Sequence, residues 1–538
     1  VFVIVVVPRD RLNTDVRVAI ANDLFEVYEG RLSAYYPSYP EGPLARVHYI
    51  IGRDKGTTPD ISQSELESSI ARLVRTWEDN LRDALGHDRD PSEARAVFNV
   101  YDRAFSAAYK EAFPATTAVS DIAVIERLNA DNRVAISFCP GSEEDSARVN
   151  LKIYHFGRPI ALSDRMPIIE NMGFRAINER TYRVKRRADD EKERIWLHDI
   201  ALARASGGEI DLDALRTRLE AAFMAVWDGQ AEDDGYAALT LNAGIPWRDV
   251  AILRALSRYL RQARLPYSQD YMWQTMDRHA HIANLLVDYF HTRFNPDPSL
   301  QQEMREARER SILGDIEAAL QDVASLDEDR IIRRFLNLVQ AMVRTNLFQL
   351  GPDGLPRPTF VFKFDPHQVE GLPEPRPYRE IFVYSPRVEG VHLRGGPIAR
   401  GGLRWSDRPQ DFRTEILGLA KAQQVKNAVI VPVGAKGGFV PKQLPPMSDR
   451  EAWFNEGRES YKVFVSSLLD VTDNLDGDTV VPPDHVTRLD GDDPYLVVAA
   501  DKGTATFSDT ANAISQAHGF WLDDAFASGG SAGYDHKK

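Results

Sequence analysis

Segments with the pattern of β-strands alternate with helical segments at the start of the chain, and this alternation constrains the fold more than any other feature. Runs rich in valine and isoleucine indicate strands, whereas apolar residues at steps of three and four behind a capping residue indicate helices. Small units of this kind form an antiparallel sheet with its helices on one face. We expect such a unit over residues 1–95, with strands at 1–7 and 45–52 and helices at 14–28 and 64–85.

A second unit with the same alternation follows over residues 96–205. Ser163 and Asp164 form a start signal for a helix between its strands. The predicted strands are residues 123–136, 148–155, 175–184 and 194–200, and the predicted helix is 163–172.

The pattern becomes helical over residues 206–350. Ile331, Phe335, Leu338 and Met342 recur at steps of three and four, which predicts one apolar face of a helix. A cluster of glycine and proline at 351–358 then indicates a boundary. Beyond it, strand-like runs at 359–364 and 380–384 begin an α/β domain that we place at 351–527.

Composition excludes several classes of protein. Apolar residues make up 43% of the chain and charged residues 27%, which is ordinary for a folded globular protein. The net charge of -14 argues against nucleic acid as a partner. No apolar run reaches the roughly 18 residues of a membrane span. Cys139 is the only cysteine, which excludes a disulfide framework and fits a reducing compartment such as the cytoplasm.

Neither of two candidate metal sites has suitable spacing. The acidic residues within 473–478 are out of register with a calcium-binding loop, so we expect a solvated turn there. His279 and His281 are two positions apart and would point away from each other on a helix. We therefore predict no metal ligands.

The segment 395–442 holds the strongest candidates for chemistry. It begins with a predicted glycine-rich turn that contains Arg400, Gly401 and Gly402. A helix predicted at 414–426 then places Gln423 and Lys426 three positions apart and therefore on one face. Glycine lets the backbone approach a ligand closely, so this segment predicts a binding site.

A buried strand is predicted at 428–433, and it ends in a glycine-rich turn that carries Lys436. A second strand at 495–500 ends at Asp501, and a helix is predicted from Ser508. Functional groups of open α/β sheets gather at the carboxyl ends of strands. We therefore expect Lys436 and Asp501 to occupy equivalent strand ends and to face one cleft.

These residues resemble the motifs of the glutamate dehydrogenase family, and in particular of its large NAD-specific branch. The motifs are GGLR at 401–404, KNA at 426–428 and G-x-KGG at 434–438, in the family's order. The resemblance covers about 380–538, and the two upstream units are similar, less specifically, to ACT-type regulatory domains. It implies a multidomain α/β chain with two ACT-like α+β units, a helical middle region and a substrate domain.

The resemblance also implies roles for individual residues. Lys436 matches the catalytic lysine that polarises the substrate carbonyl and water, and Asp501 matches the catalytic aspartate that exchanges a proton with the amino nitrogen. Lys426 and Gln423 match positions that hold the substrate α-carboxylate. Arg400 stands where the small enzymes have a lysine for the distal carboxylate, and arginine also offers a fork to a carboxylate. Gly401 and Gly402 complete the substrate-binding set.

The cofactor that the resemblance implies is NAD, but the residues that would hold it are not identifiable in this sequence. The family binds NAD in a Rossmann-type domain downstream, and the sequence has no G-x-G-x-x-G motif. We expect 528–538 to begin the linker to such a domain. Together with the start on valine, this indicates a piece of a longer polypeptide.

The implied function is the reversible oxidative deamination of L-glutamate to 2-oxoglutarate and ammonium, by a homo-oligomer in the cytoplasm that acts on no membrane and no nucleic acid. Two alternatives stay open. One is an amino-acid dehydrogenase of the same family with another substrate, and the other is a non-catalytic sensing or assembly module. For the two N-terminal units, amino-acid effectors and a purely structural role are equally open.

Overall fold

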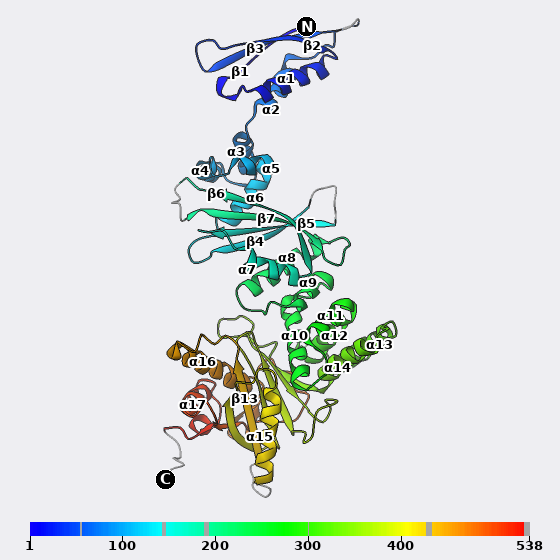
Figure 1. Cartoon of the computed structure of the whole chain (residues 1–538), viewed down its shortest axis with the longest axis vertical. Helices are drawn as coiled ribbons and strands as arrows, with labels where there is room; N and C mark the ends of the chain where they lie inside the picture. Colours follow the sequence, from blue (N-terminus) through cyan, green and yellow to red (C-terminus); the bar gives the residue numbers. More distant parts are fainter. Residues whose placement is uncertain are drawn as a thin grey trace. The chain divides into compact units, whose positions relative to one another are not determined.

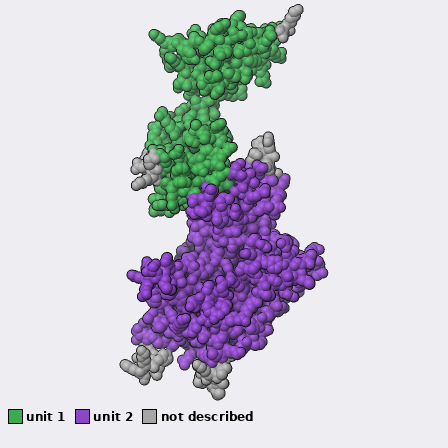
Figure 2. Space-filling view, viewed as in Figure 1, with its two compact units in different colours: residues 1–137, 151–160, 179–200 green, residues 138–150, 161–178, 201–538 purple. Residues whose placement is uncertain are grey.

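The computed structural model describes residues 1–53, 56, 58–141, 147–187, 193–297, 299, 301–426 and 433–531, without the side chains of residues 88 and 424–426. The chain divides into two compact units, shown in green and purple in Figure 2. The first comprises Val1–Ser137, Leu151–Ile160 and Glu179–Ile200, and the second comprises Phe138–Asn150, Ala161–Asn178 and Ala201–Lys538.

The chain begins with a three-stranded antiparallel sheet in the order β1-β3-β2. Figure 1 shows helices α1 and α2 on one face of this sheet. Leu24 of α1 and Val47 of β3 are fully buried between the two layers. The predicted strands and first helix are confirmed, and β2, which the sequence pattern did not reveal, is added. The bounds are β1 Phe2–Pro8, α1 Thr14–Val27, β2 Arg31–Ser38, β3 Leu44–Gly52 and α2 Gln63–Val74.

The single helix predicted at 64–85 is wrong, because the structure has two helices there. Helix α2 ends at Val74, and α3 (Trp77–Asp88) begins after Thr76. The Thr76 side chain accepts a hydrogen bond from the Asp79 amide, and the Asp79 carboxylate accepts one from the Thr76 amide. This reciprocal capping box starts a new helix and interrupts an otherwise continuous apolar pattern.

The strand predicted at 123–136 is also partly wrong, because α6 (Ala115–Ile125) extends into it. Ala118, Ile122 and Ile125 are buried at helical spacing in one core. The strand β4 begins only at Val134, and it belongs to a four-stranded sheet in the order β4-β5-β7-β6. The remaining bounds are α4 Pro91–Tyr101, α5 Ala107–Ala112, β4 Val134–Pro140, β5 Arg148–Phe156, α7 Leu162–Asn171, β6 Phe174–Val184 and β7 Ile195–Arg204.

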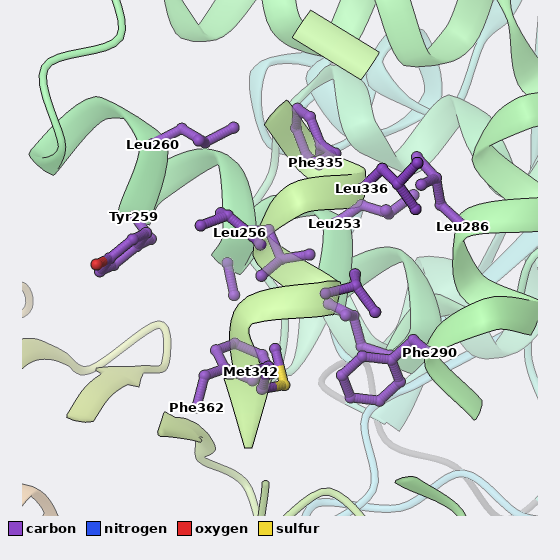
Figure 3. Packing of buried hydrophobic residues seen from close by; sticks show 14 of the residues in the cluster. Leu253, Leu256, Tyr259, Leu260, Leu286, Phe290, Phe335, Leu336, Met342 and Phe362 are labelled. Carbon is purple, nitrogen blue, oxygen red and sulfur yellow. The ribbon is translucent and has the colours of Figure 1, made fainter. Parts of the chain in front are cut away.

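The described residues of the predicted helical region, 206–350, contain seven α-helices, and the last of them ends at Ala341. Ile331, Phe335 and Leu338 of α14 are fully buried, as the apolar spacing predicts. The prediction is wrong for Met342, because α14 ends at Ala341 and Met342 begins the strand β8 (Met342–Thr345). Figure 3 shows Phe335 packed among side chains of α10, α12 and the adjoining sheet. The bounds are α8 Leu212–Trp227, α9 Ala238–Asn242, α10 Trp247–Gln262, α11 Gln269–Arg278, α12 Ala280–Phe294, α13 Gln302–Leu320 and α14 Leu326–Ala341. No helix in the described ranges combines the length and the apolar composition that crossing a bilayer requires.

An eight-stranded mixed sheet forms the remainder of the second unit, in the order β17-β16-β12-β13-β11-β10-β9-β8. The first four strands in this order are mutually parallel, and the pairs from β13 to β8 are antiparallel. The bounds are β8 Met342–Thr345, β9 Phe360–Phe364, β10 Arg379–Tyr384, β11 Val388–Arg394, β12 Ala399–Trp405, β13 Val433–Pro441, β16 Val497–Ala500 and β17 Ala527–Ser528.

Helices cover both faces of this sheet. Helix α15 (Phe412–Lys426) packs on β13 and shares its core with the helical middle region. Helices α16 (Arg450–Leu469) and α17 (Ser508–Ala517) pack in a separate core on the other face, as Figure 1 shows. From β12 the chain passes to β13 on one side and then returns to β16 on the other side. This reversal makes the carboxyl ends of β12 and β16 a topological switch point, where α/β sheets bind ligands.

The prediction of a solvated turn at 473–478 is wrong for its first residue, Asp473. Asp473 is fully buried and accepts hydrogen bonds from Arg344 of β8, 2.8 Å from Nη1 to Oδ1. Arg344 also pairs with Asp490, whose other oxygen lies 2.6 Å from Nζ of Lys363 on β9. The rest of the turn forms a hairpin of β14 (Asn474–Asp476) and β15 (Thr479–Val481). These buried pairs anchor the loop that precedes β16 to the antiparallel half of the sheet.

Candidate active site

Lys436 and Asp501 form an ion pair at the switch point. Strands β13 and β16 lie on either side of β12, and Asp501 follows the last residue of β16 directly. Nζ of Lys436 lies 2.8 Å from Oδ2 of Asp501. The side chains are 19% and 12% exposed, so both can still reach a ligand. The structure therefore brings together the two residues that the sequence assigned to one cleft.

The two glycine-rich turns predicted around Gly401 and Lys436 are wrong, because both segments are strands. Residues 401–404 lie within β12 and 434–438 within β13, so Lys436 projects from a strand interior. The glycines are needed for close packing. A Cβ on Gly401 would overlap the carbonyl oxygen of Ala435, and one on Gly437 would lie 2.5 Å from Cδ2 of Leu403.

Asp501 is held by donors from several parts of the chain. Its Oδ1 accepts hydrogen bonds from Arg404, 3.0 Å from Nη2, and from the Lys502 amide, 2.6 Å away. Burial acts to raise the pKa of Asp501, but the hydrogen bonds from Lys436, the Lys502 amide and Arg404 outweigh burial and lower it. The Asp501 amide donates to Thr504 Oγ1, which itself donates to the Leu403 carbonyl. Asp501 is thus an oriented carboxylate.

Arg404 and Glu415 extend this network, and sequence reasoning did not single them out. Arg404 Nη1 donates to Glu415 Oε1 at 3.0 Å, and Ser406 donates to the other oxygen of Glu415 at 2.6 Å. Burial alone would lower the pKa of Arg404, but its bonds to Glu415 and Asp501 raise it. The available signal was the arginine of GGLR followed by an acidic residue in the first turn of α15.

Gln423 lies beside the same strands, on α15. Its Nε2 makes a long hydrogen bond, 3.4 Å, to the carbonyl oxygen of Arg400. Its Oε1 is buried without a hydrogen-bond partner within the described ranges, beside Gly434. The Arg400 side chain is exposed, at the start of β12.

Lys426 is the final residue of α15, and its side chain lies outside what the structure describes. Residues 427–432, which include the rest of the KNA motif and nearly all of the strand predicted at 428–433, also lie outside the described residues. The other predicted site residues, Gly401 and Gly402, sit in β12 next to the ion pair. A Cβ on Gly402 would lie 2.9 Å from Cβ of Asp501.

Family models of glutamate dehydrogenase match five successive parts of the chain. "Bacterial NAD-glutamate dehydrogenase, catalytic domain" matches residues 315–538, which contain the ion pair. The other matches are the ACT2 domain at 1–78, helical motif 2 at 84–128, the ACT3 domain at 133–215 and helical motif 3 at 231–296.

Curated relatives match along almost the whole chain. The NAD-specific glutamate dehydrogenase of Pseudomonas aeruginosa is 46% identical over 531 residues, which cover 99% of this chain and 33% of that protein. The enzymes of the same name from Halomonas elongata and Mycobacterium tuberculosis are 47% and 43% identical, with 33% and 34% of their lengths covered. The chain thus spans about a third of the length of these relatives. It belongs to the family of the large NAD-specific glutamate dehydrogenases.

Proposed function

We propose that this chain supplies the glutamate-binding half of an active site that interconverts L-glutamate with 2-oxoglutarate and ammonium, with NAD as the hydride acceptor. The observation that carries the proposal is the ion pair of Lys436 and Asp501 at the switch point, 2.8 Å from Nζ to Oδ2. A fixed cation beside a fixed carboxylate suits a reaction that develops charge on a carbonyl oxygen and moves a proton at nitrogen.

In this proposal, Lys436 acts on the carbonyl oxygen of the substrate and Asp501 acts on the nitrogen. The Lys436 ammonium donates a hydrogen bond to the C2 carbonyl oxygen of 2-oxoglutarate and so makes C2 more electrophilic. Asp501, held ionised by its donors, accepts a proton from the nitrogen that attacks C2 and returns it in the reverse direction. Arg404 and the Lys502 amide occupy Oδ1 of Asp501, so Oδ2 is the oxygen that faces the reacting nitrogen.

The carboxylates of the substrate require further donors. We assign Gln423 and Lys426 to the α-carboxylate and Arg400 to the distal carboxylate. The support for Gln423 is its weakly held amide beside Gly434, and the support for Arg400 is its exposed guanidinium on the strand that carries Gly401 and Gly402. Two carboxylates bound at opposite ends would orient C2 toward Lys436.

The described residues do not fit the phosphates of NAD. The three connections that lead from a parallel strand into a helix are 406–411, 442–449 and 501–507, and they contain a single glycine, Gly503. A Cβ on Gly503 would lie 2.8 Å from Cβ of Trp405, so this glycine serves packing. We therefore derive no step through NAD from this chain. A homo-oligomeric assembly and a cytoplasmic location stay predictions from the sequence.

The test is the rate of NADH oxidation with 2-oxoglutarate and ammonium, measured on the natural protein that carries this sequence. We expect Lys436→Ala to lower turnover by ~10³-fold or more while the circular dichroism spectrum is unchanged. Lys462→Ala, which removes a half-exposed lysine of α16, is the matched control and should retain full activity. Near-normal turnover of Lys436→Ala would refute the assignment, and a preference for a monocarboxylic 2-oxo acid would favour another amino-acid dehydrogenase.

A further inference from the structure

A polar cavity of about 400 Å³ lies in the second unit, away from the ion pair. Asp470, at the C-terminal end of α16, forms part of its wall. Because α16 returns the chain from the end of β13 toward the start of β16, Asp470 lies near the amino ends of the parallel strands. Asp501 lies at their carboxyl ends, so the cavity is separate from the candidate active site.

Gln349 lines this cavity and has an unpartnered acceptor among the described residues. Its side chain is almost entirely buried, and its Nε2 donates to the carbonyl oxygens of Asp470 and Asp484 at 3.1 and 3.0 Å. Only the NH₂ group can donate to two carbonyls, so the orientation of the amide is fixed. Its Oε1 therefore points away from them and has no partner among the described residues. A buried acceptor without a donor is costly unless a ligand or water supplies one.

Asp470 adds a second acceptor. Its Oδ2 accepts from Asn346 Nδ2 at 2.9 Å, but its Oδ1 has no hydrogen bond within the described part of the chain. Arg357 is the nearest cation, with Nη1 3.4 Å from Oδ1. Burial raises the pKa of Asp470, and Arg357 and Asn346 only partly oppose that rise. His518, which also lines the cavity, opposes the rise as well.

Arg357 supplies the complementary donor in the same wall. Its Nε is buried and makes no hydrogen bond in the described ranges. Arg357 pairs with Asp470 and still has an unused donor, Nε, beside the acceptors of Asp470 and Gln349. This juxtaposition of opposite charges matches the ammonium and carboxylate groups that share one α-carbon. The rest of the lining includes an apolar surface of Val481, Pro482 and Phe520, and it also includes Asp484, His485 and His518.

We propose that this cavity binds a free α-amino acid with an uncharged side chain. The ammonium group donates to Asp470 Oδ1 and Gln349 Oε1, and the carboxylate accepts from Arg357. The side chain packs on Val481, Pro482 and Phe520. This inference does not rest on the proposed catalytic function, because it concerns different residues and a different edge of the sheet.

Calorimetric titration of the full chain with three matched probes tests the proposal. L-valine has both charged groups, isobutylamine lacks the carboxylate, and 3-methylbutanoate lacks the ammonium. We expect L-valine to bind at one site, and each truncated probe to bind at least ~10-fold more weakly, since a hydrogen bond to a charged group is lost. If isobutylamine bound as tightly as valine, the cavity would be a cation site. If 3-methylbutanoate bound as tightly as valine, it would be an anion site. If valine did not bind, the cavity would bind no amino acid. Each of these results would overturn the proposal.

Substitutions test whether valine binds in this cavity. Arg357→Met should weaken valine at least ~10-fold without weakening isobutylamine, because the carboxylate partner is lost while Asp470 loses a competing cation. Arg376→Met, which removes an arginine outside the cavity, should bind valine as the parent chain does. Lys436→Ala should also bind valine normally. Loss of valine binding in Lys436→Ala but not in Arg357→Met would place the ligand at the ion pair and refute the inference.

Discussion

Asp501 receives hydrogen bonds from a strand neighbour, from the next residue of its own loop and from the arginine of β12. These donors do two separate things. They favour the charged form against the effect of burial, and they fix which oxygen faces the cleft. The first effect is visible in stability at different pH values, and the second is visible in turnover.

The pKa of Asp501 in the folded chain lies below its ordinary value of 3.8, so its hydrogen bonds stabilise the folded state above that pH. The stabilisation is lost as the pH falls through the lower, folded-state pKa. We therefore expect the parent chain to exceed Asp501→Asn in free energy of unfolding at neutral pH. The difference should shrink below a pH of about 4. Urea titrations of both proteins across this range measure it, and a difference that grows on acidification would contradict the ionised pair.

Arg404 is a positioning residue in the proposed reaction, since it acts through Asp501. Arg404→Met should lower kcat ~10–100-fold with little change in KM for 2-oxoglutarate. It should also move the acidic limb of the pH profile toward higher pH, because Asp501 loses a cationic donor. Arg408→Met removes an exposed arginine that forms an ion pair with Asp411 and makes no hydrogen bond to Asp501 within the described residues, and it should leave the profile unchanged. An unshifted profile in Arg404→Met would mean that the arginine is only structural.

At the level of strands and helices, the glycines of the two site strands explain both a success and a failure of the sequence predictions. The motifs led to Lys436 and Asp501, which the fold brings together. The same glycines suggested turns, whereas they make room for neighbouring strands and for α15. A sequence does not show whether a glycine serves a positive φ or a close contact. Arg404 was missed for a related reason, since its partner Asp501 is 97 residues away.

Two glycines of neighbouring elements should respond oppositely to the same substitution. Gly401→Ala would place a methyl group on the Ala435 carbonyl oxygen and force β12 and β13 apart, so we expect it to lower the free energy of unfolding by ~3 kcal/mol or more. Gly418 lies within α15 with open space around it, so Gly418→Ala should raise that free energy by about 0.5–1 kcal/mol. Chemical denaturation compares the two. A well-tolerated Gly401→Ala would show that the strands do not pack this closely.

At the scale of the whole molecule, the described residues form several hydrophobic cores that share no residue. Leu24 belongs to the core of the N-terminal sheet, and Phe335 belongs to the core of the helical region. The apolar periodicity predicted each of these elements separately. It could not predict the division into two units, because that depends on which apolar faces meet.

We expect separate cores to unfold independently of each other. Leu24→Ala and Phe335→Ala each create a cavity and should cost about 2–5 and 3–5 kcal/mol of local stability. Since no residue is common to the two cores, we expect faster amide hydrogen exchange in Leu24→Ala only within the N-terminal sheet and its helices. In Phe335→Ala the exchange should rise only in the elements that share its core, which are helices α9–α15 and the sheet beside them. The double variant should show the sum of both changes. Exchange that rises in the helical region of Leu24→Ala would mean that the cores unfold as one cooperative structure.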